Sequence, residues 1–320
     1  MIYDYEDING EPHELKVKNI NPYLTGGKDI FIESRGKPIH KYPELFKGSQ
    51  PTDGGFLILS ELEKNRLFEH DTGSSKWIRP FWGADEFLYN RKRFCLWLKN
   101  IQPFELKNSK EILERVQKVR ESRLKSPTQS VRDFANFPTL FTQDRQPSST
   151  YLAIPEVSSE NRIYIPIGFL NPDIICSNKL QIIPNASLFM FGILESLMHM
   201  IWTKYVCGRL ESRLSYSPQV YNNFPWPENP TEKQKETVEA SAQAVLDARA
   251  MFPGTSLADL YDPNTMPPVL VKAHQALDKA VDLCYRPQPF INETKRIEFL
   301  FELYDRYTSG MFVKEKKKRI

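Results

Sequence analysis

The order of apolar and polar residues divides the chain into a part of mixed strand and helix character and a C-terminal part that is helical throughout. Residues 2–8 and 13–18 alternate around Asn9-Gly10, which predicts a β-hairpin because both residues of such a tight turn need positive φ. Over residues 56–98, short apolar runs alternate with loop signals, and this pattern predicts short strands with connecting helices.

The middle of the chain is expected to carry two longer helices and several short strands. Residues 109–124 have apolar side chains at 112, 113, 116 and 119, the spacing of one helix face, with arginine and lysine elsewhere on the helix. Residues 162–167, 174–176 and 180–183 form β-rich runs and predict strands. Residues 186–214 are mostly apolar and predict one long helix that ends with Arg209 and Arg213.

A boundary follows at residues 222–227, Asn-Asn-Phe-Pro-Trp-Pro, because the two prolines cannot continue a helix. Beyond it, an Asn-Pro pair is expected to begin a helix over residues 229–251. Apolar residues between 270 and 284 form a second helix face, and Asn292 is expected to cap a third helix. We expect these three helices to form a small bundle.

These patterns predict an α+β fold, in which a mixed α/β domain is followed by a small all-α helical domain. We place the boundaries at 1–47 for the hairpin and a connector, 48–225 for the mixed domain, and 226–320 for the helical domain with its basic tail. A length of 320 residues agrees with about two domains.

Composition excludes several classes of protein. Apolar residues make up 40% and charged residues 26% of the chain, as in a soluble globular protein rather than a disordered or collagen-like one. The longest apolar stretch, residues 186–201, is interrupted by Glu195 and His199 and falls short of a membrane-spanning helix. The acidic N-terminus is unlike a signal peptide, and the four cysteines fit neither a disulfide framework nor a zinc site. We therefore expect a cytoplasmic protein with no membrane partner.

Charge is spread unevenly along the chain, although the net charge is only +3. Residues 91–125 hold eleven Lys and Arg against four Glu, while residues 226–313 hold nine basic and thirteen acidic residues. Residues 314–319 add five basic residues and one acidic residue. The basic segment suits a docking surface for a polyanion, and a solvated helix face accounts for it equally well.

We find no self-contained catalytic set and no metal-ligand pattern. Asn21-Pro22-Tyr23 lacks the second proline of the Asn-Pro-Pro-aromatic loop with which amine-methylating enzymes hold a flipped base, which favours an ordinary turn. His199 lies in an apolar helix, where a packed and hydrogen-bonded histidine is the simpler interpretation. The glycine pairs do not form a cofactor-binding fingerprint.

The remaining candidates suit a nucleic-acid surface. Glu160-Asn161-Arg162 begins the predicted strand, where the side chains of residues 160 and 162 share one face. Such a pair can read C·G, because glutamate accepts the cytosine amine and arginine donates to guanine. An ordinary surface ion pair is the alternative. The phosphate-binding candidates are the basic residues Arg115 and Arg123, and the group that follows the apolar helix, Arg209, Arg213 and Ser217.

Several motifs, in this order, resemble the C-terminal half of the MmeI-like fused restriction and modification enzymes. They are residues 51–55 (PTDGG), 79–87 (RPFWGADEF), 157–169, 220–227 and 277–285. The resemblance covers nearly the whole chain.

This resemblance implies a target recognition domain and a helical C-terminal domain that follow an adenine-specific methyltransferase. The parent protein is then expected to use S-adenosylmethionine and to flip an adenine out of double-stranded DNA, while this chain holds no cofactor and no catalytic residue. Its partners are double-stranded DNA and the methyltransferase domain of the parent chain, whose trailing edge is the N-terminal hairpin. The segment that contains Glu160 and Arg162 corresponds to a base-reading segment, and Thr128 and Gln129 are a second candidate.

Two other classes of function stay open. The chain could be a self-contained enzyme with an unrecognised site, and binding of S-adenosylmethionine to the isolated chain would favour that hypothesis. It could also be a protein-interaction module that docks through its acidic helices, in which case it would bind a second protein and no duplex.

Overall fold

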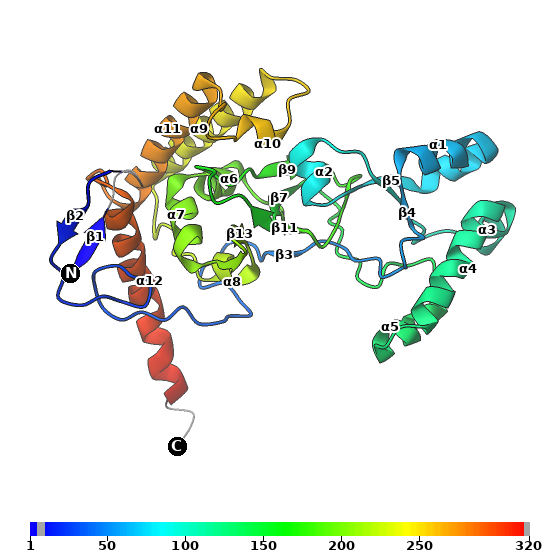
Figure 1. Ribbon diagram of the computed structural model, residues 1–320, viewed down its shortest axis with the longest axis horizontal. Coiled ribbons are helices and arrows are strands. Elements are labelled where there is room, and N and C mark those ends of the chain that lie inside the picture. The colour runs from blue at the N-terminus through cyan, green and yellow to red at the C-terminus, as the bar shows by residue number, and fades with distance from the viewer. Residues whose placement is uncertain (5–9, 317–320) are drawn as a thin grey trace.

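The computed structural model describes residues 1–4 and 10–316, and side chains for residues 1–3 and 10–309. Figure 1 shows an elongated molecule, with α1, α3, α4 and α5 at one end and the N-terminal hairpin and C-terminal helices at the other. Among the described residues, 1–4 and 10–316, no helix is long and apolar enough to cross a membrane.

The described strands form four small sheets, in the orders β1-β2, β10-β5-β6-β4, β3-β11-β7-β9 and β12-β13-β8. All neighbours are antiparallel except β10 and β5. The strands are Ile2–Asp4 (β1), His13–Leu15 (β2), Phe46–Lys47 (β3), Ile58–Leu59 (β4), Ile78–Trp82 (β5), Phe94–Leu96 (β6), Tyr151–Pro155 (β7), Val157–Ser158 (β8), Gly168–Leu170 (β9), Ile175–Cys176 (β10), Leu180–Pro184 (β11), Gly208–Leu210 (β12) and Arg213–Ser215 (β13).

The α-helices are Glu61–His70 (α1), Ala84–Tyr89 (α2), Pro103–Asn108 (α3), Lys110–Leu124 (α4), Gln129–Asp133 (α5), Leu188–Leu194 (α6), Leu197–Val206 (α7), Pro218–Asn222 (α8), Glu232–Ala250 (α9), Leu257–Leu260 (α10), Pro268–Tyr285 (α11) and Glu293–Lys316 (α12). Two 3-10 helices lie at Thr72–Trp77 (η1) and Phe134–Asn136 (η2).

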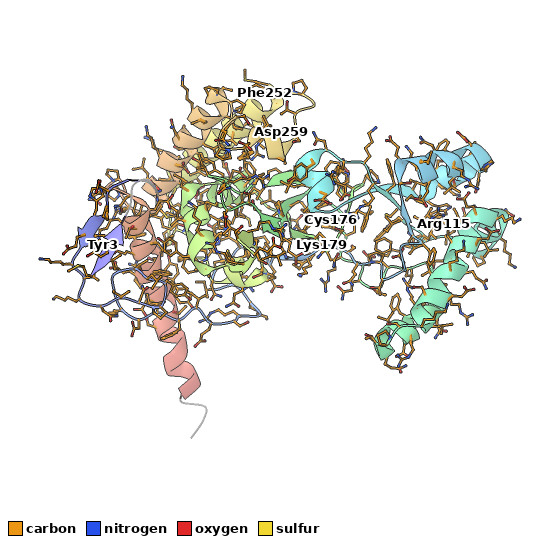
Figure 2. All side chains as sticks on the ribbon, in the orientation of Figure 1. Tyr3, Arg115, Cys176, Lys179, Phe252 and Asp259 are labelled. Carbon is orange, nitrogen blue, oxygen red and sulfur yellow. The ribbon has the colours of Figure 1, made fainter. Side chains whose placement is uncertain are left out.

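Residues 56–81 and 94–141, together with Ile175 of β10, form a small lobe with its own apolar core, whereas α2 packs with β7 and β11 in another cluster. In this lobe α4 buries Ile112, Val116 and Val119 against the sheet side, as the apolar spacing predicts, while Leu113 is 40% exposed. Figure 2 shows Arg115 in this lobe, and Cys176 and Lys179 nearer the middle of the molecule.

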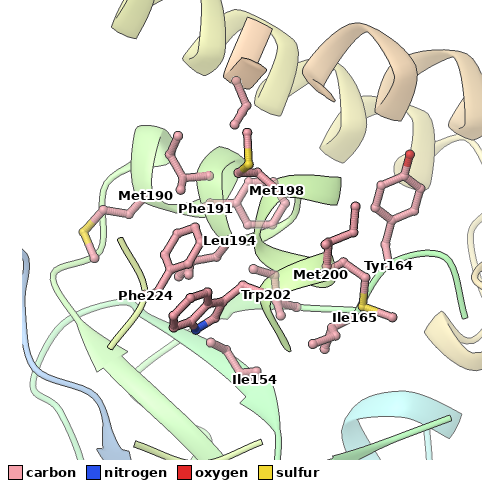
Figure 3. Packing of buried hydrophobic residues seen from close by; sticks show 14 of the residues in the cluster. Ile154, Tyr164, Ile165, Met190, Phe191, Leu194, Met198, Met200, Trp202 and Phe224 are labelled. Atoms are coloured by element: carbon pink, nitrogen blue, oxygen red, sulfur yellow. The ribbon is translucent and has the colours of Figure 1, made fainter. Parts of the chain in front are cut away.

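A larger core joins the remaining helices to the sheet β3-β11-β7-β9. Figure 3 shows part of it, in which Trp202, Phe224, Phe191 and the methionines of α6 and α7 pack together. Gly192 lets α6 and α9 approach closely, because a Cβ atom there would lie 2.7 Å from Cγ1 of Val238.

The C-terminal helices form as predicted but pack differently. Thr231, rather than Asn229, caps α9 through a capping box with Gln234, and Asn292 accepts a hydrogen bond from the backbone N–H of Lys295 at the start of α12. Helices α9 and α11 pack against each other and α6, whereas α12 packs along α7. The C-terminal region is helical as expected, but its three helices do not pack only on one another, since they also complete the larger core.

The predicted single helix over residues 186–214 is also wrong. It breaks after α6 where Glu195 turns its carboxylate into the core, and α7 ends before Gly208. The residues that follow form the hairpin β12-β13, whose two-residue turn contains Glu211 at φ 58°. Arg209 and Arg213 therefore lie on strands rather than on a helix end.

The N-terminal hairpin is confirmed by the pairing of β1 with β2. Part of its predicted turn, Asn9 included, lies outside the described residues, as do the side chains of the basic tail at 314–319. The following connector packs on α12, where the rings of Tyr23 and Phe301 are 4.9 Å apart.

Candidate nucleic-acid interface

Residues 159–167 form an irregular loop between β8 and β9, which we call the 159–167 loop. The predicted strand over 162–167 is therefore wrong, and so is the shared face of residues 160 and 162. Glu160 and Asn161 lie in a turn, where Glu160 is half-buried and Asn161 is exposed. Arg162 is only 8% exposed. The Arg162 guanidinium donates a long hydrogen bond of 3.4 Å to the Ser158 hydroxyl.

The β12-β13 hairpin lies beside this loop, because β13 pairs with β8. Arg209 forms an ion pair of 3.4 Å with Glu160 and donates a hydrogen bond to the Ser212 carbonyl. Arg213 forms an ion pair of 2.9 Å with Glu211. The fold thus brings Glu160 and Arg209 together, a contact that the sequence analysis did not predict.

Ser217, the fifth residue predicted to bind phosphate, is the N-cap residue of α8. Its side chain makes no capping hydrogen bond and is half-buried.

A groove of about 540 Å³ separates the hairpin from α2. Its cations are balanced by carboxylates, since Arg93 pairs with Glu86 at 2.7 Å and Lys179 pairs with Glu156 at 3.4 Å. The residues that line it are Gly83, Ala84, Asp85, Glu86, Arg93, Glu156, Val157, Lys179, Arg209, Leu210 and Ser215.

Arg123 does not face solvent, contrary to its predicted role as a phosphate ligand. Its side chain is 1% exposed, and its N–H groups donate five hydrogen bonds to backbone carbonyls. The acceptors belong to Pro51, Thr52, Phe134, Phe137 and Leu140. Arg123 follows Val119 by four residues, so it continues the buried face of α4.

Arg115 is also engaged within the small lobe. It forms ion pairs with Glu63 at 3.0 Å and Glu111 at 3.6 Å and donates to the Phe56 carbonyl. The backbone N–H of Ser60, followed by the Arg115 guanidinium, lowers the pKa of Glu63 to about 2. The pair is therefore fully charged near neutral pH, and Arg115 is held in place.

The exposed cations of α4 are other residues, namely Lys110, Lys118, Arg120 and, just beyond the helix, Lys125. Lys118 lies 6.0 Å from the centre of the Phe56 ring. Residues 112, 116, 119 and 123 form the buried face of α4, and these cations lie outside it. This spacing distinguishes them from Arg123 in the sequence alone.

Thr128 and Gln129 lie at the start of α5 in the small lobe and are exposed. The Gln129 amide donates to Asp133 at 2.7 Å and accepts from Arg132 at 2.5 Å. This second candidate therefore lies on α5 of the small lobe, and the 159–167 loop lies outside that lobe.

The segment Asn21-Pro22-Tyr23 forms a turn. The buried Asn21 side-chain oxygen accepts hydrogen bonds from the backbone N–H groups of Tyr23 and Thr25, and its amide donates to the Thr25 hydroxyl. Both acceptor positions of the Asn21 side-chain oxygen are therefore used within the turn, so it cannot accept from an adenine amine, and these residues do not fit a methyl-transfer site. We assign no step through S-adenosylmethionine to them.

His199 is a packed core residue, as predicted. Its ring nitrogens lie 2.7 Å from the Leu194 carbonyl oxygen and 2.9 Å from the Tyr216 hydroxyl, and burial lowers its pKa to about 4.

Comparison with known proteins identifies the family. Residues 26–228 match the model "MmeI, target recognition domain", and residues 230–312 match "MmeI, C-terminal domain". The chain therefore belongs to the family of MmeI, whose target recognition and C-terminal domains it carries. The resemblance and the α+β fold class expected from the sequence are confirmed, while the domain boundaries stay a prediction.

Two relatives show how much of a longer protein this chain covers. It is 38% identical to DNA methyltransferase A of Bacillus subtilis (strain 168) over 293 residues, which are 91% of this chain and 33% of that protein. It is 48% identical, with a TM-score of 0.89, to the Type IIL restriction-modification enzyme MmeI in a structure solved in complex with DNA. That match covers 96% of this chain and 41% of the MmeI chain.

Proposed function

We propose that this chain recognises a sequence in double-stranded DNA, as the target recognition part of a bacterial restriction-modification methyltransferase. The observation that carries the proposal is the likeness over 96% of the chain, at 48% identity, to an enzyme solved in complex with DNA. Two features suit this role, the exposed cations of α4 and the Glu160–Asn161 turn of the 159–167 loop with its neighbouring arginines.

In this proposal the exposed cations hold the DNA backbone and carry no sequence information. They comprise Lys110, Lys118, Arg120 and Lys125 on and after α4, and Arg209 and Arg213 on the hairpin, with the Ser217 hydroxyl beside them. Arg115 and Arg123 are left out because both are engaged inside the small lobe.

Base readout falls to Glu160, Asn161 and Arg162, with Thr128 and Gln129 as the second candidate. The Glu160–Arg209 ion pair is exposed, so opening it costs less than about 1 kcal/mol. Its opening releases a carboxylate for a cytosine amine and a guanidinium for a phosphate. Arg162 has to exchange its long hydrogen bond with Ser158 for a guanine edge.

We further propose that the parent protein methylates an adenine, which its catalytic domain flips out of the duplex. S-adenosylmethionine would supply the methyl group in that domain. The role of this chain is to fix the register of the duplex, so that the same adenine is presented to the catalytic domain each time.

The first test measures binding to duplexes at several salt concentrations. We expect the logarithm of the affinity to fall linearly with the logarithm of salt, with a slope of about −0.9 for each phosphate contacted. A slope near zero, or stable binding of a second protein with no binding of any duplex, would contradict the proposal.

The second test exchanges the charges of the candidate readers. The double variant Glu160→Lys with Arg162→Asp should recognise a different base pair at one position of the site while retaining methylation in the parent protein. Sequencing the methylated sites decides the point, and an unchanged site removes both residues from the readout. The control Arg213→Ala should weaken binding to all sequences about equally.

A further inference from the structure

The 159–167 loop has no strand or helix hydrogen bonds of its own, yet side chains from distant helices hold its second half. Both backbone groups of Ile167 are bound by charged side chains. Its N–H donates to Oε2 of Glu195 at 3.2 Å, and its carbonyl accepts from Nη1 of Arg249 at 2.7 Å. Arg249 lies on α9, in the region that matches the MmeI C-terminal domain.

Tyr164 is held in the same way by α11. Its hydroxyl donates to Oδ2 of Asp278 at 2.6 Å, and its ring stacks on His274 with the ring centres 3.9 Å apart and the planes at 23°. The other oxygen of Asp278 accepts from the backbone N–H of Leu197 at the start of α7. Figure 3 shows the Tyr164 side chain extending from its loop toward the helices above it.

A buried polar network holds Ile167 and reaches Tyr164 through the stacked His274 ring. Arg249 donates to Oε1 of Glu195 at 2.5 Å and, through Nε, to the Tyr261 hydroxyl at 2.8 Å. The Tyr261 hydroxyl in turn lies 2.8 Å from Nε2 of His274. Glu195 and His274 are at most 1% exposed, so their hydrogen bonds face little competition from water.

The candidate readers lie between two fixed points. On one side, Ser158 of β8 pairs with Leu214 of β13. On the other side, Tyr164 is clamped to α11. The intervening stretch therefore has little conformational freedom to lose when it meets a ligand, and preorganisation of this kind favours both affinity and discrimination.

We infer that the C-terminal helices set the base-reading conformation of the 159–167 loop, with Tyr164, Asp278 and Arg249 as positioning residues. The inference rests on the proposed function and adds a role for the acidic helical region, which reads no base itself. Tyr164 and Ile167 contact that region, so a disturbance of the clamp changes the backbone that carries Glu160 and Arg162.

The test is Tyr164→Phe, which keeps the ring on His274 and removes only the hydroxyl bond to Asp278. A matched control is Tyr221→Phe, which removes a buried hydroxyl bond of the same length, 2.6 Å, to the Pro43 carbonyl outside the loop. Binding of the full chain is measured to its preferred duplex and to a series of duplexes that each change one base pair.

We expect Tyr164→Phe to reduce the preference for the correct base pair roughly three- to tenfold, which corresponds to the loss of one hydrogen bond. The loss should occur at the base pair whose recognition the double variant Glu160→Lys with Arg162→Asp changes. Discrimination at the other base pairs should stay within about twofold. Tyr221→Phe should leave the whole profile unchanged. Asp278→Leu, which removes the acceptor of the Tyr164 hydroxyl, is the second variant and should repeat the Tyr164→Phe profile.

Three results would overturn the inference. An unchanged profile in both Tyr164→Phe and Asp278→Leu, or an equal loss at every base pair, would show that the clamp only stabilises the fold. A wild-type chain with no preference among duplexes would overturn the proposed function as well. That last failure is recognised before any variant is made, so the two failures are distinguishable.

Discussion

Arg123 in the small lobe and Arg249 in the larger core both bond to groups inside the protein, but the two arginines have different roles. Arg123 has no carboxylate among its hydrogen-bond partners, and its charge is balanced by five backbone carbonyls of the small lobe. Arg249 pairs with Glu195 and joins α9 to the 159–167 loop and to Tyr261. Arg123 therefore holds one lobe together, whereas Arg249 connects the C-terminal helices to the candidate interface.

The comparison shows that basic residues in a sequence are not the same as a basic surface. Of the cations in residues 91–125, several pair with carboxylates, such as Lys92 with Glu61 and Lys99 with Asp144. The surface available to a polyanion is set by the cations that remain exposed, either without such a pair or, like Arg209 and Arg213, in an exposed ion pair that opens at little cost.

The largest effect is expected for Arg123→Met, a change of similar volume. It leaves the carbonyl oxygens of Pro51, Thr52 and Leu140 without a donor inside the small lobe, while two further acceptors keep a backbone donor. We therefore expect the free energy of unfolding to fall by about 4 kcal/mol or more. Denaturant titration measures this loss. Arg120→Met, an exposed change on the same helix, should cost less than about 0.5 kcal/mol. A loss for Arg123→Met as small as that of the control would show that water replaces the guanidinium.

A smaller loss, of about 3 kcal/mol, is expected for Arg249→Met, because it leaves Glu195 buried without its cation. Burial already raises the pKa of Glu195 to about 7, and protonation of that carboxyl limits the loss. The double variant with Glu195→Gln should recover part of the stability in denaturant titration. If the stability loss of the double variant equals the sum of the losses of the two single variants, the coupling of Arg249 with Glu195 is contradicted.

The smallest effect is a pH dependence that Asp278 contributes. Burial raises its pKa from 3.8 to about 6, against the opposing effects of its hydrogen bonds with Leu197 and Tyr164 and of the nearby Arg296; Asp282 adds to the rise. Because the folded state binds this proton more tightly than the unfolded chain, the Asp278 contribution to the free energy of unfolding falls as pH rises from about 4 to about 6.

Replacement by asparagine removes that contribution. The stability of Asp278→Asn relative to the wild-type protein should therefore improve by about 2 kcal/mol between pH 4 and pH 7. Denaturant titrations across this range measure the difference. Asp247→Asn, an exposed change on α9, should show a flat difference. A flat difference for Asp278→Asn as well would contradict the raised pKa.

Local patterns predicted α4 and the start of α12 well, since the apolar stripe of α4 and the N-terminal cap of α12 depend on neighbours within one or two turns. They missed the break between α6 and α7. They failed over residues 162–167, where β-branched residues suggested a strand. Pro166 has no N–H to donate, and the Ile167 backbone bonds to Glu195 and Arg249 instead of a strand.

The candidate site shows the same division. Residue types and the family resemblance drew attention to Glu160, Arg162 and the arginines that follow α7. The pairing of Glu160 with Arg209 could not be predicted, because it depends on β13 lying beside β8. The burial of Arg123 was within reach of the sequence, since it lies four residues after Val119 on the apolar stripe.

The amino-acid sequence by itself determined the family, the mixed fold with its helical end, and the position of the longest helices, because periodicity and capping act over a few residues. Only the tertiary structure decided which charges face solvent and that α9 and α11 hold the 159–167 loop. Those outcomes depend on contacts between residues about 80 to 115 positions apart, such as Ile167 with Arg249 and Tyr164 with Asp278, which no local pattern encodes.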